Sequence, residues 1–123
     1  MAMSAAPPLP AALIARAARC WRTARDTRQP VQQHLHALLA PLGYEMMAPV
    51  IDSLMTLGEA CLDRPLCRGC PFGPDADAAL LCALLADPAR LDRLPCRGDG
   101  RARHIRDVFA GALTSARVMA ALA

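Results

Sequence analysis

The sequence contains no lysine and very few aromatic residues. All 14 basic residues are arginines, and aromatic residues make up 3% of the 123 positions. Aromatic and β-branched residues favour strands, whereas alanine and leucine, which are abundant here, are strong helix formers. The composition therefore predicts an all-α fold, a compact four- to five-helix bundle with no sheet.

Long apolar runs and targeting signals are also missing. Pro7, Pro8 and Pro10 interrupt the first apolar stretch, and no basic residue precedes it as in a secretory signal. No stretch approaches the roughly 20 apolar residues of a membrane-spanning helix. We therefore expect a cytoplasmic protein with no membrane partner, a disordered tail over 1–8 and a single helical-bundle domain over 9–123.

Residue sets typical of catalysis are not found either. The chain has no Ser/His/Asp arrangement or carboxylate pair at a convincing spacing, and no phosphate loop or nucleotide fingerprint. A catalytic role is thus the least supported hypothesis, although the sequence leaves the question of an enzyme open. The favoured hypothesis is a protein that acts by binding, as an adaptor or regulatory module.

Apolar residues recur at three- and four-residue spacing along most of the chain, which is the pattern of packed helices. The predicted helices cover 10–26, 30–41, 46–62, 76–86, 88–94 and 102–121. Asp87 and Pro88 are expected to cap and begin the short helix over 88–94. The helix over 76–86 consists almost entirely of Ala and Leu, so we expect it to be buried on all sides.

Two helices carry the clearest apolar stripes. In the helix over 46–62 the inner stripe is expected at Val50, Leu54, Leu57 and Cys61, with Ile51 and Met55 alongside it. The helix over 102–121 has the widest apolar face, formed by Ile105, Val108, Phe109, Leu113 and Met119. This second face is wide enough to serve a core and a partner, so the sequence predicts a homodimer.

Charge is distributed unevenly along the chain. Residues 1–43 carry a net charge of +4, residues 44–100 carry −4 and residues 101–123 carry +3. We favour complementarity between helices as the explanation, within one bundle or across a dimer. The alternative is a basic surface for an acidic partner or a nucleic acid, formed by Arg16, Arg19, Arg22 and Arg25. Trp21 is the single aromatic residue nearby, so nucleic acid is the less favoured partner.

The six cysteines fall into two classes. Cys20, Cys61 and Cys82 lie within apolar helical patterns and are expected to pack in the core. The other three, Cys67, Cys70 and Cys96, lie in connections rich in Gly and Pro. Residues 60–69 and 89–98 also form a near-repeat, since seven of their ten positions match.

The loop cysteines suggest three interpretations. Cys67 and Cys70 have the two-residue spacing of a zinc knuckle, and Cys96 and His104 would complete a Cys₃His zinc site. Alternatively, Cys67 and Cys70 form a reversible dithiol, with Arg68 favouring the thiolate. In the third interpretation the loop thiols are structural or incidental. Spacing alone does not choose among a zinc cofactor, a redox pair and structural thiols.

Overall fold

The computed structural model describes residues 10–67, 76–94 and 100–121 of the chain. Within these ranges it forms helices and contains no strand, which confirms the all-α prediction. The predicted tail over 1–8 lies outside the described residues. The elements in chain order are α1 (Ala11–Asp26), α2 (Val31–Leu39), η1 (Ala40–Leu42), α3 (Met47–Leu62), α4 (Ala76–Ala86), η2 (Pro88–Arg93) and α5 (Gly100–Ala121).

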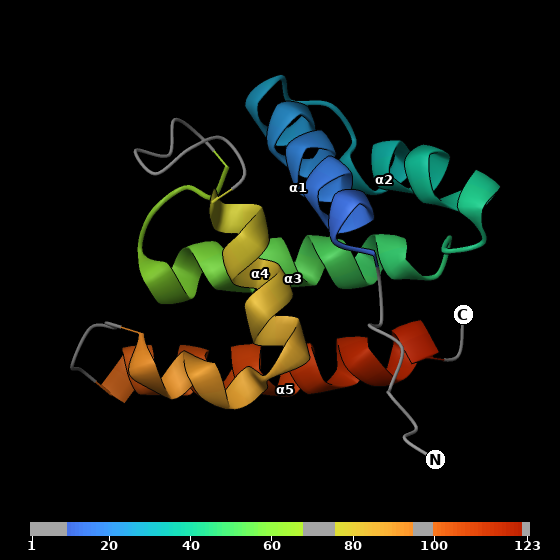
Figure 1. Cartoon of the computed structure of the whole chain (residues 1–123). Coiled ribbons are helices and arrows are strands. Elements are labelled where there is room, and N and C mark those ends of the chain that lie inside the picture. The colour runs from blue at the N-terminus through green and yellow to red at the C-terminus, as the bar shows by residue number, and fades with distance from the viewer. Residues whose placement is uncertain (1–9, 68–75, 95–99, 122–123) are drawn as a thin grey trace, which may run out of the picture.

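Helix α3 is the central element of the bundle (Figure 1). α5 runs beside it and makes the most extensive contact between any two helices. α1 and α2 pack together and both contact α3 on its other side. α4 crosses from α1 to α5 and contacts both, so it ties the two sides of the bundle together.

The helix ends follow local sequence signals. η1 ends at Gly43, whose φ of 83° is a left-handed conformation that glycine adopts without strain. Asp87 caps η2, since its Oδ1 accepts a hydrogen bond of 3.2 Å from the Ala89 backbone N–H. The short helix predicted over 88–94 is a 3-10 helix rather than an α-helix, which is common in short connecting segments.

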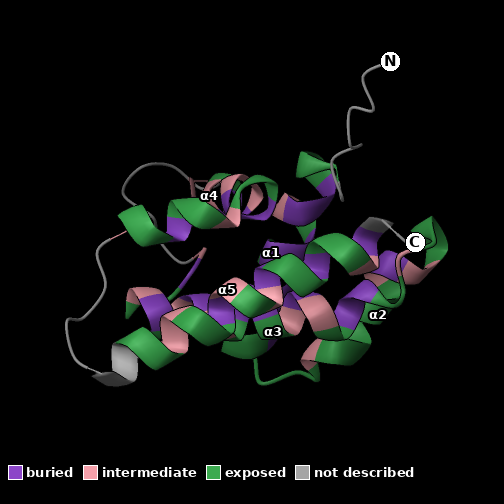
Figure 2. Cartoon of the chain, turned by 90° about the horizontal axis from the view of Figure 1, so that it is seen from below, coloured by how far each residue is buried: buried purple, intermediate pink, exposed green. Residues whose placement is uncertain are grey.

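The core lies between α3 and the helices on both of its sides, and buried segments line the inner faces of the helices (Figure 2). Met47 and Met55 are each 1% exposed and serve as core filler. The largest fully buried side chains are Trp21, Phe109, Leu35, Leu39, Met47, Ile51, Leu54, Met55, Leu84, Leu91 and Leu113.

The buried face of α3 is rotated relative to the predicted stripe. Val50 and Leu57 are only half-buried, although Leu54 and Cys61 are buried as expected. Gly58 is buried in the same face, and a Cβ there would lie 2.9 Å from Leu66 Cδ1 and 3.5 Å from the Phe109 ring. The glycine leaves room for these two side chains against the α3 backbone.

Two further expectations about burial need correction. α4 is not buried on all sides, because Ala79 and Ala86 are exposed while Leu81, Leu84 and Leu85 face the core. A helix with no polar face can still lie at the surface, since apolar atoms form much of any protein exterior.

The apolar face of α5 is also divided. Phe109 and Leu113 are at most 1% exposed, whereas Val108 is 43% exposed and lies on the outside. The predicted wide face therefore serves the core through one part and faces solvent through another.

Candidate functional site

The predicted zinc ligands are only partly within the described residues. Cys67 follows α3 and is half-buried, and His104 is exposed on α5. Cys70 and Cys96 lie outside the described residues. Within the part of the chain that the structure describes, no three His, Cys, Asp or Glu side chains come together in a group that would hold a metal ion. The zinc site thus remains a prediction from spacing.

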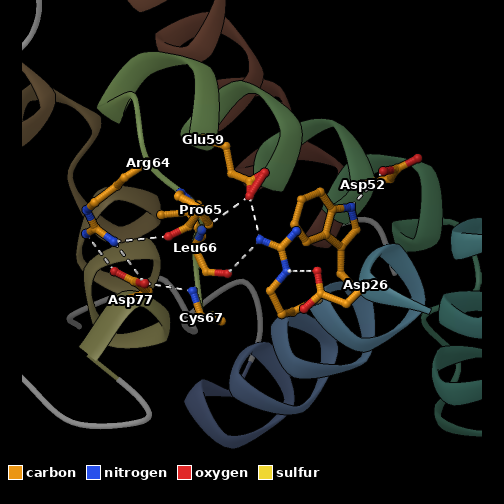
Figure 3. Close-up of polar contacts among 10 residues, drawn as sticks. Asp26, Asp52, Glu59, Arg64, Pro65, Leu66, Cys67 and Asp77 are labelled. Atoms are coloured by element: carbon orange, nitrogen blue, oxygen red, sulfur yellow. Dashed lines mark hydrogen bonds and ion pairs between the residues drawn. The ribbon is translucent and has the colours of Figure 1, made fainter. Parts of the chain in front are cut away.

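The backbone at Cys67 is held by a buried carboxylate on α4 (Figure 3). Asp77 accepts a hydrogen bond of 2.7 Å from the Cys67 N–H, and its two oxygens accept bonds of 2.7 and 3.0 Å from Arg64. Cys67 has a φ of 62°, a conformation that side chains rarely adopt and that these contacts support. Asp77 therefore fixes the backbone at Cys67, the first cysteine of the predicted pair.

The environment of Asp77 favours its charged form. Burial acts to raise the pKa of this carboxyl, but the hydrogen bonds from Arg64 and from the Cys67 N–H, together with the Arg64 charge, outweigh burial. The pKa of Asp77 consequently lies below its ordinary value. Arg64 lies 13 positions before Asp77 in the chain, so no pattern local to α4 indicates this contact.

Asp77→Asn tests this contact. The substitution removes the charge and one acceptor at nearly constant shape, so the free energy of unfolding should fall by about 1–3 kcal/mol at pH 7. A carboxyl with a lowered pKa stabilises the fold above its ordinary pKa and loses that effect as the pH falls through the lowered value. The gap between Asp77→Asn and the unmodified protein should therefore close in acid, as measured by urea unfolding at a series of pH values. The exposed Asp92→Asn is the matched control, and a gap for Asp77→Asn that stays constant with pH would contradict the assignment.

Arg22 joins α1 to the end of α3 from a buried position (Figure 3). The residue is 7% exposed, and its guanidinium donates to Glu59 Oε1 at 2.7 Å and to the Leu66 carbonyl at 3.4 Å. Glu59 Oε1 also accepts from the Leu66 N–H at 3.3 Å, and Arg22 Nε lies 3.4 Å from Asp26. The guanidinium and Glu59 together hold both backbone groups of Leu66 one residue before Cys67.

The alternative of a basic surface formed by four arginines includes Arg22, but in the structure Arg22 lies inside. A signal for this was present, because Arg22 follows Ile14 and Ala18 at four-residue steps and both are buried. The charge obscured this signal. Nothing local to α1 indicates that Glu59, 37 residues further along the chain, is close enough to pair with it.

The remaining three arginines of the predicted surface do not form one patch. Arg16 and Arg25 are nine residues apart, which places them about 180° apart around a helix. Arg25 lies over the Trp21 ring, with its Cζ 5.0 Å from the ring centroid. Trp21 itself is fully buried and donates from Nε1 to Asp52 at 2.8 Å, so it presents no face for stacking a base.

Arg16 and Arg19 instead border an open groove between α1 and α2. The groove has a volume of about 420 Å³, which lies within the range of small-ligand sites. Its nine lining residues are Arg16, Arg19, Cys20, Thr23, Ala24, Thr27, Gln29, His34 and Leu38, and none of them is Asp or Glu. The groove therefore combines basic and hydroxyl groups on its rim with a small apolar floor.

The helical cysteines are less uniformly buried than expected. Cys61 is 5% exposed, whereas Cys20 and Cys82 are half-buried. Burial raises the pKa of both half-buried thiols, so they are held in the neutral form at neutral pH. Cys20 thus contributes a neutral thiol to the floor of the groove.

No family model, curated protein or solved structure matches this chain. Among the residues that the structure describes, none of the helices has both the length and the apolar character required to cross a bilayer. Among the described residues, the basic groove and the fixed backbone at Cys67 are the features that bear on function.

Proposed function

We propose that this chain is a small helical binding module, an adaptor or regulatory protein, that receives an acidic segment of a partner protein in the groove between α1 and α2. The observation that carries the proposal is the composition of the groove, in which Arg16, Arg19 and His34 face a space of about 420 Å³ and no lining residue is acidic. Arginine forks match carboxylate groups, which accept two parallel hydrogen bonds.

The geometry favours a protein segment over a nucleic acid. A duplex requires a basic surface that follows a row of phosphates. Here Arg22 is buried, and Arg25 projects from the side of α1 remote from Arg16. The two arginines left at the groove suit a short acidic stretch.

Location and assembly are parts of the same proposal. Among the described residues, Cys20, Cys61, Cys67 and Cys82 form no disulfide, which agrees with a reducing compartment such as the cytoplasm. We also propose that the module is a homodimer, and the exposed Val108 and Val118 on α5 support a contact between copies.

The groove is tested with a labelled oligoglutamate peptide and fluorescence anisotropy. We expect salt-sensitive binding that weakens about tenfold in Arg16→Gln/Arg19→Gln, because each exposed ion pair contributes modestly. Arg25→Gln/Arg93→Gln removes the same charge from positions that do not line the groove, and it should bind as the unmodified protein does. Equal losses in the two variants, or tighter binding of duplex DNA than of the peptide, would contradict the proposal.

A thiol or zinc function is the second candidate. Its support is the fixed backbone at Cys67. Asp77 accepts a hydrogen bond from the Cys67 N–H. In the preceding residue, Leu66, the carbonyl accepts from Arg22 and the N–H donates to Glu59. Such fixed backbone orients a ligand or a reactive thiol. Metal analysis and thiol counting on the purified protein distinguish these states. Zinc held by Cys67, Cys70, Cys96 and His104 would appear as bound metal. An oxidised Cys67–Cys70 pair would lower the number of titratable thiols.

A further inference from the structure

The groove between α1 and α2 has two chemically different ends. Its α1 wall consists of Arg16, Arg19, Cys20, Thr23, Ala24 and the C-cap residue Thr27. At the helical rise this wall is about 16 Å long, with both arginines in its first third and Thr27 at its far end. An extended chain rises about 3.3 Å per residue, so a segment of about five residues matches the length of the wall.

The Thr27 end of the groove disfavours a carboxylate. The Thr27 hydroxyl donates to the Thr23 carbonyl at 2.7 Å, so its oxygen is left as an acceptor. Gln29 is held beside this end, since its backbone N–H donates to the Ala24 carbonyl at 2.8 Å. α1 also ends here, and the C-terminal end of a helix carries a partial negative charge. An N–H group of an occupant would find a partner at Thr27, whereas an acidic group would be repelled.

The floor between the two ends is apolar. Cys20, Ala24 and Leu38 form it, with Ala24 buried and the other two half-buried. Around the axis of α1, Cys20 and Ala24 lie toward the core, whereas Arg19 and Thr23 lie toward the rim. A carboxylate placed on this floor would lose water without gaining a charged partner, so a small apolar side chain fits it better.

We propose that the groove selects an extended segment of the partner whose acidic residues are confined to one end. The acidic end lies at Arg16 and Arg19, a small apolar residue covers Cys20, and a hydrogen-bond donor lies at Thr27. This inference rests on the proposed function and adds to it the order of residues that the groove selects.

Labelled peptides of about five residues test the order by fluorescence anisotropy at about pH 8, where histidine carries little charge. The grouped peptides are Glu-Glu-Val-Ala-Gln and its reversal, Gln-Ala-Val-Glu-Glu, so that both chain directions are sampled. The split peptide, Glu-Val-Ala-Gln-Glu, has the same composition with an acid at each end. All peptides have blocked termini, so that only side chains carry charge.

We expect one grouped peptide to bind about tenfold more tightly than the split peptide, because the split peptide places a carboxylate against an acceptor. The same grouped peptide should also bind more tightly than an oligoglutamate of equal length, although the oligoglutamate carries more charge. Attraction by net charge alone would make the oligoglutamate the tightest ligand, and that result would overturn the inference.

Thr27→Arg should remove the preference. The substitution places a cation at the uncharged end, so the split peptide should then bind about as tightly as the grouped one. Thr114→Arg is the matched control, since Thr114 is exposed on α5, is not a lining residue and donates in the same way to the carbonyl four residues earlier. A Thr27→Arg variant that keeps the preference of the unmodified protein would contradict the role of this end.

Cys20 reports whether the floor is covered. Saturation with the grouped peptide should slow alkylation of Cys20 by about fivefold or more, because access controls thiol reactivity. Cys82 is the internal control, since it is also half-buried and does not line the groove. Mass spectrometry gives both rates, and an unchanged rate at Cys20 with peptide bound would place the peptide elsewhere.

The proposed function and the residue order fail separately. Suppose that the grouped, split and oligoglutamate peptides bind equally and all lose affinity in Arg16→Gln/Arg19→Gln. The groove then remains a site for acidic segments, and the order is wrong. If none of the peptides binds, both the function and the order are wrong.

Discussion

Replacing Phe109 with alanine should lower the free energy of unfolding by about 3–5 kcal/mol, as large truncations in a packed core do. The ring is 1% exposed and lies against Gly58 at the most extensive helix–helix contact, between α3 and α5. No side chain on Gly58 is present to fill the space that the ring would leave. A loss of this size is a large part of the total stability of a small domain.

Urea unfolding followed by circular dichroism measures the effect of Phe109→Ala. The control is Leu42→Ala, because Leu42 is 50% exposed and its truncation should change the free energy of unfolding by about 0.5 kcal/mol or less. Comparable losses in the two variants would show that the α3–α5 contact is not where the core is concentrated.

Replacing Glu59 with leucine should destabilise the protein by about 3 kcal/mol, because it leaves the buried Arg22 guanidinium without its closest charged partner. The side chains of Arg22 and Glu59 are 9% and 18% exposed, so water compensates little. The Leu66 N–H loses its acceptor in the same variant. Arg22 retains Asp26 and the Leu66 carbonyl, which limits the loss.

A double-mutant cycle separates the pair from its surroundings. Arg22→Met/Glu59→Leu replaces both charges with apolar groups, and we expect it to recover much of the stability that Glu59→Leu loses. Equilibrium unfolding of the four proteins gives the coupling energy. If the two single losses simply add in the double variant, Arg22 and Glu59 act independently and the buried pair is not what holds Leu66.

The same pair bears on the uneven charge of the chain. Arg22 belongs to the positive segment 1–43 and Glu59 to the negative segment 44–100, and Gln32 and Trp21 of the first segment both donate to Asp52 of the second. Complementarity between helices of one bundle therefore accounts for part of the asymmetry. Arg16 and Arg19 account for another part, since they face the groove.

Helix positions were predictable because their signals are local. The helix predicted over 46–62 is observed at Met47–Leu62, and the one over 76–86 at Ala76–Ala86. Apolar spacing and caps such as Asp87 act within one or two turns, so they can be recognised without knowing the neighbours. The candidate groove was predictable only in part, since Arg16 and Arg19 stood out as exposed basic residues but their position beside His34 did not.

The sequence by itself determined that the protein is helical, where most of its helices begin and end, and that Phe109 and Leu113 belong to a core. The tertiary structure decided which faces meet, because that choice depends on residues distant in the chain. Gly58 of α3 lies against Leu66 and Phe109, and the periodicity of α3 does not indicate which residues of other segments it meets. Arg22 is buried although it is charged, because Glu59 and the Leu66 carbonyl accept hydrogen bonds from its Nη1, and these partners, 37 and 44 positions away, become neighbours only when the helices pack.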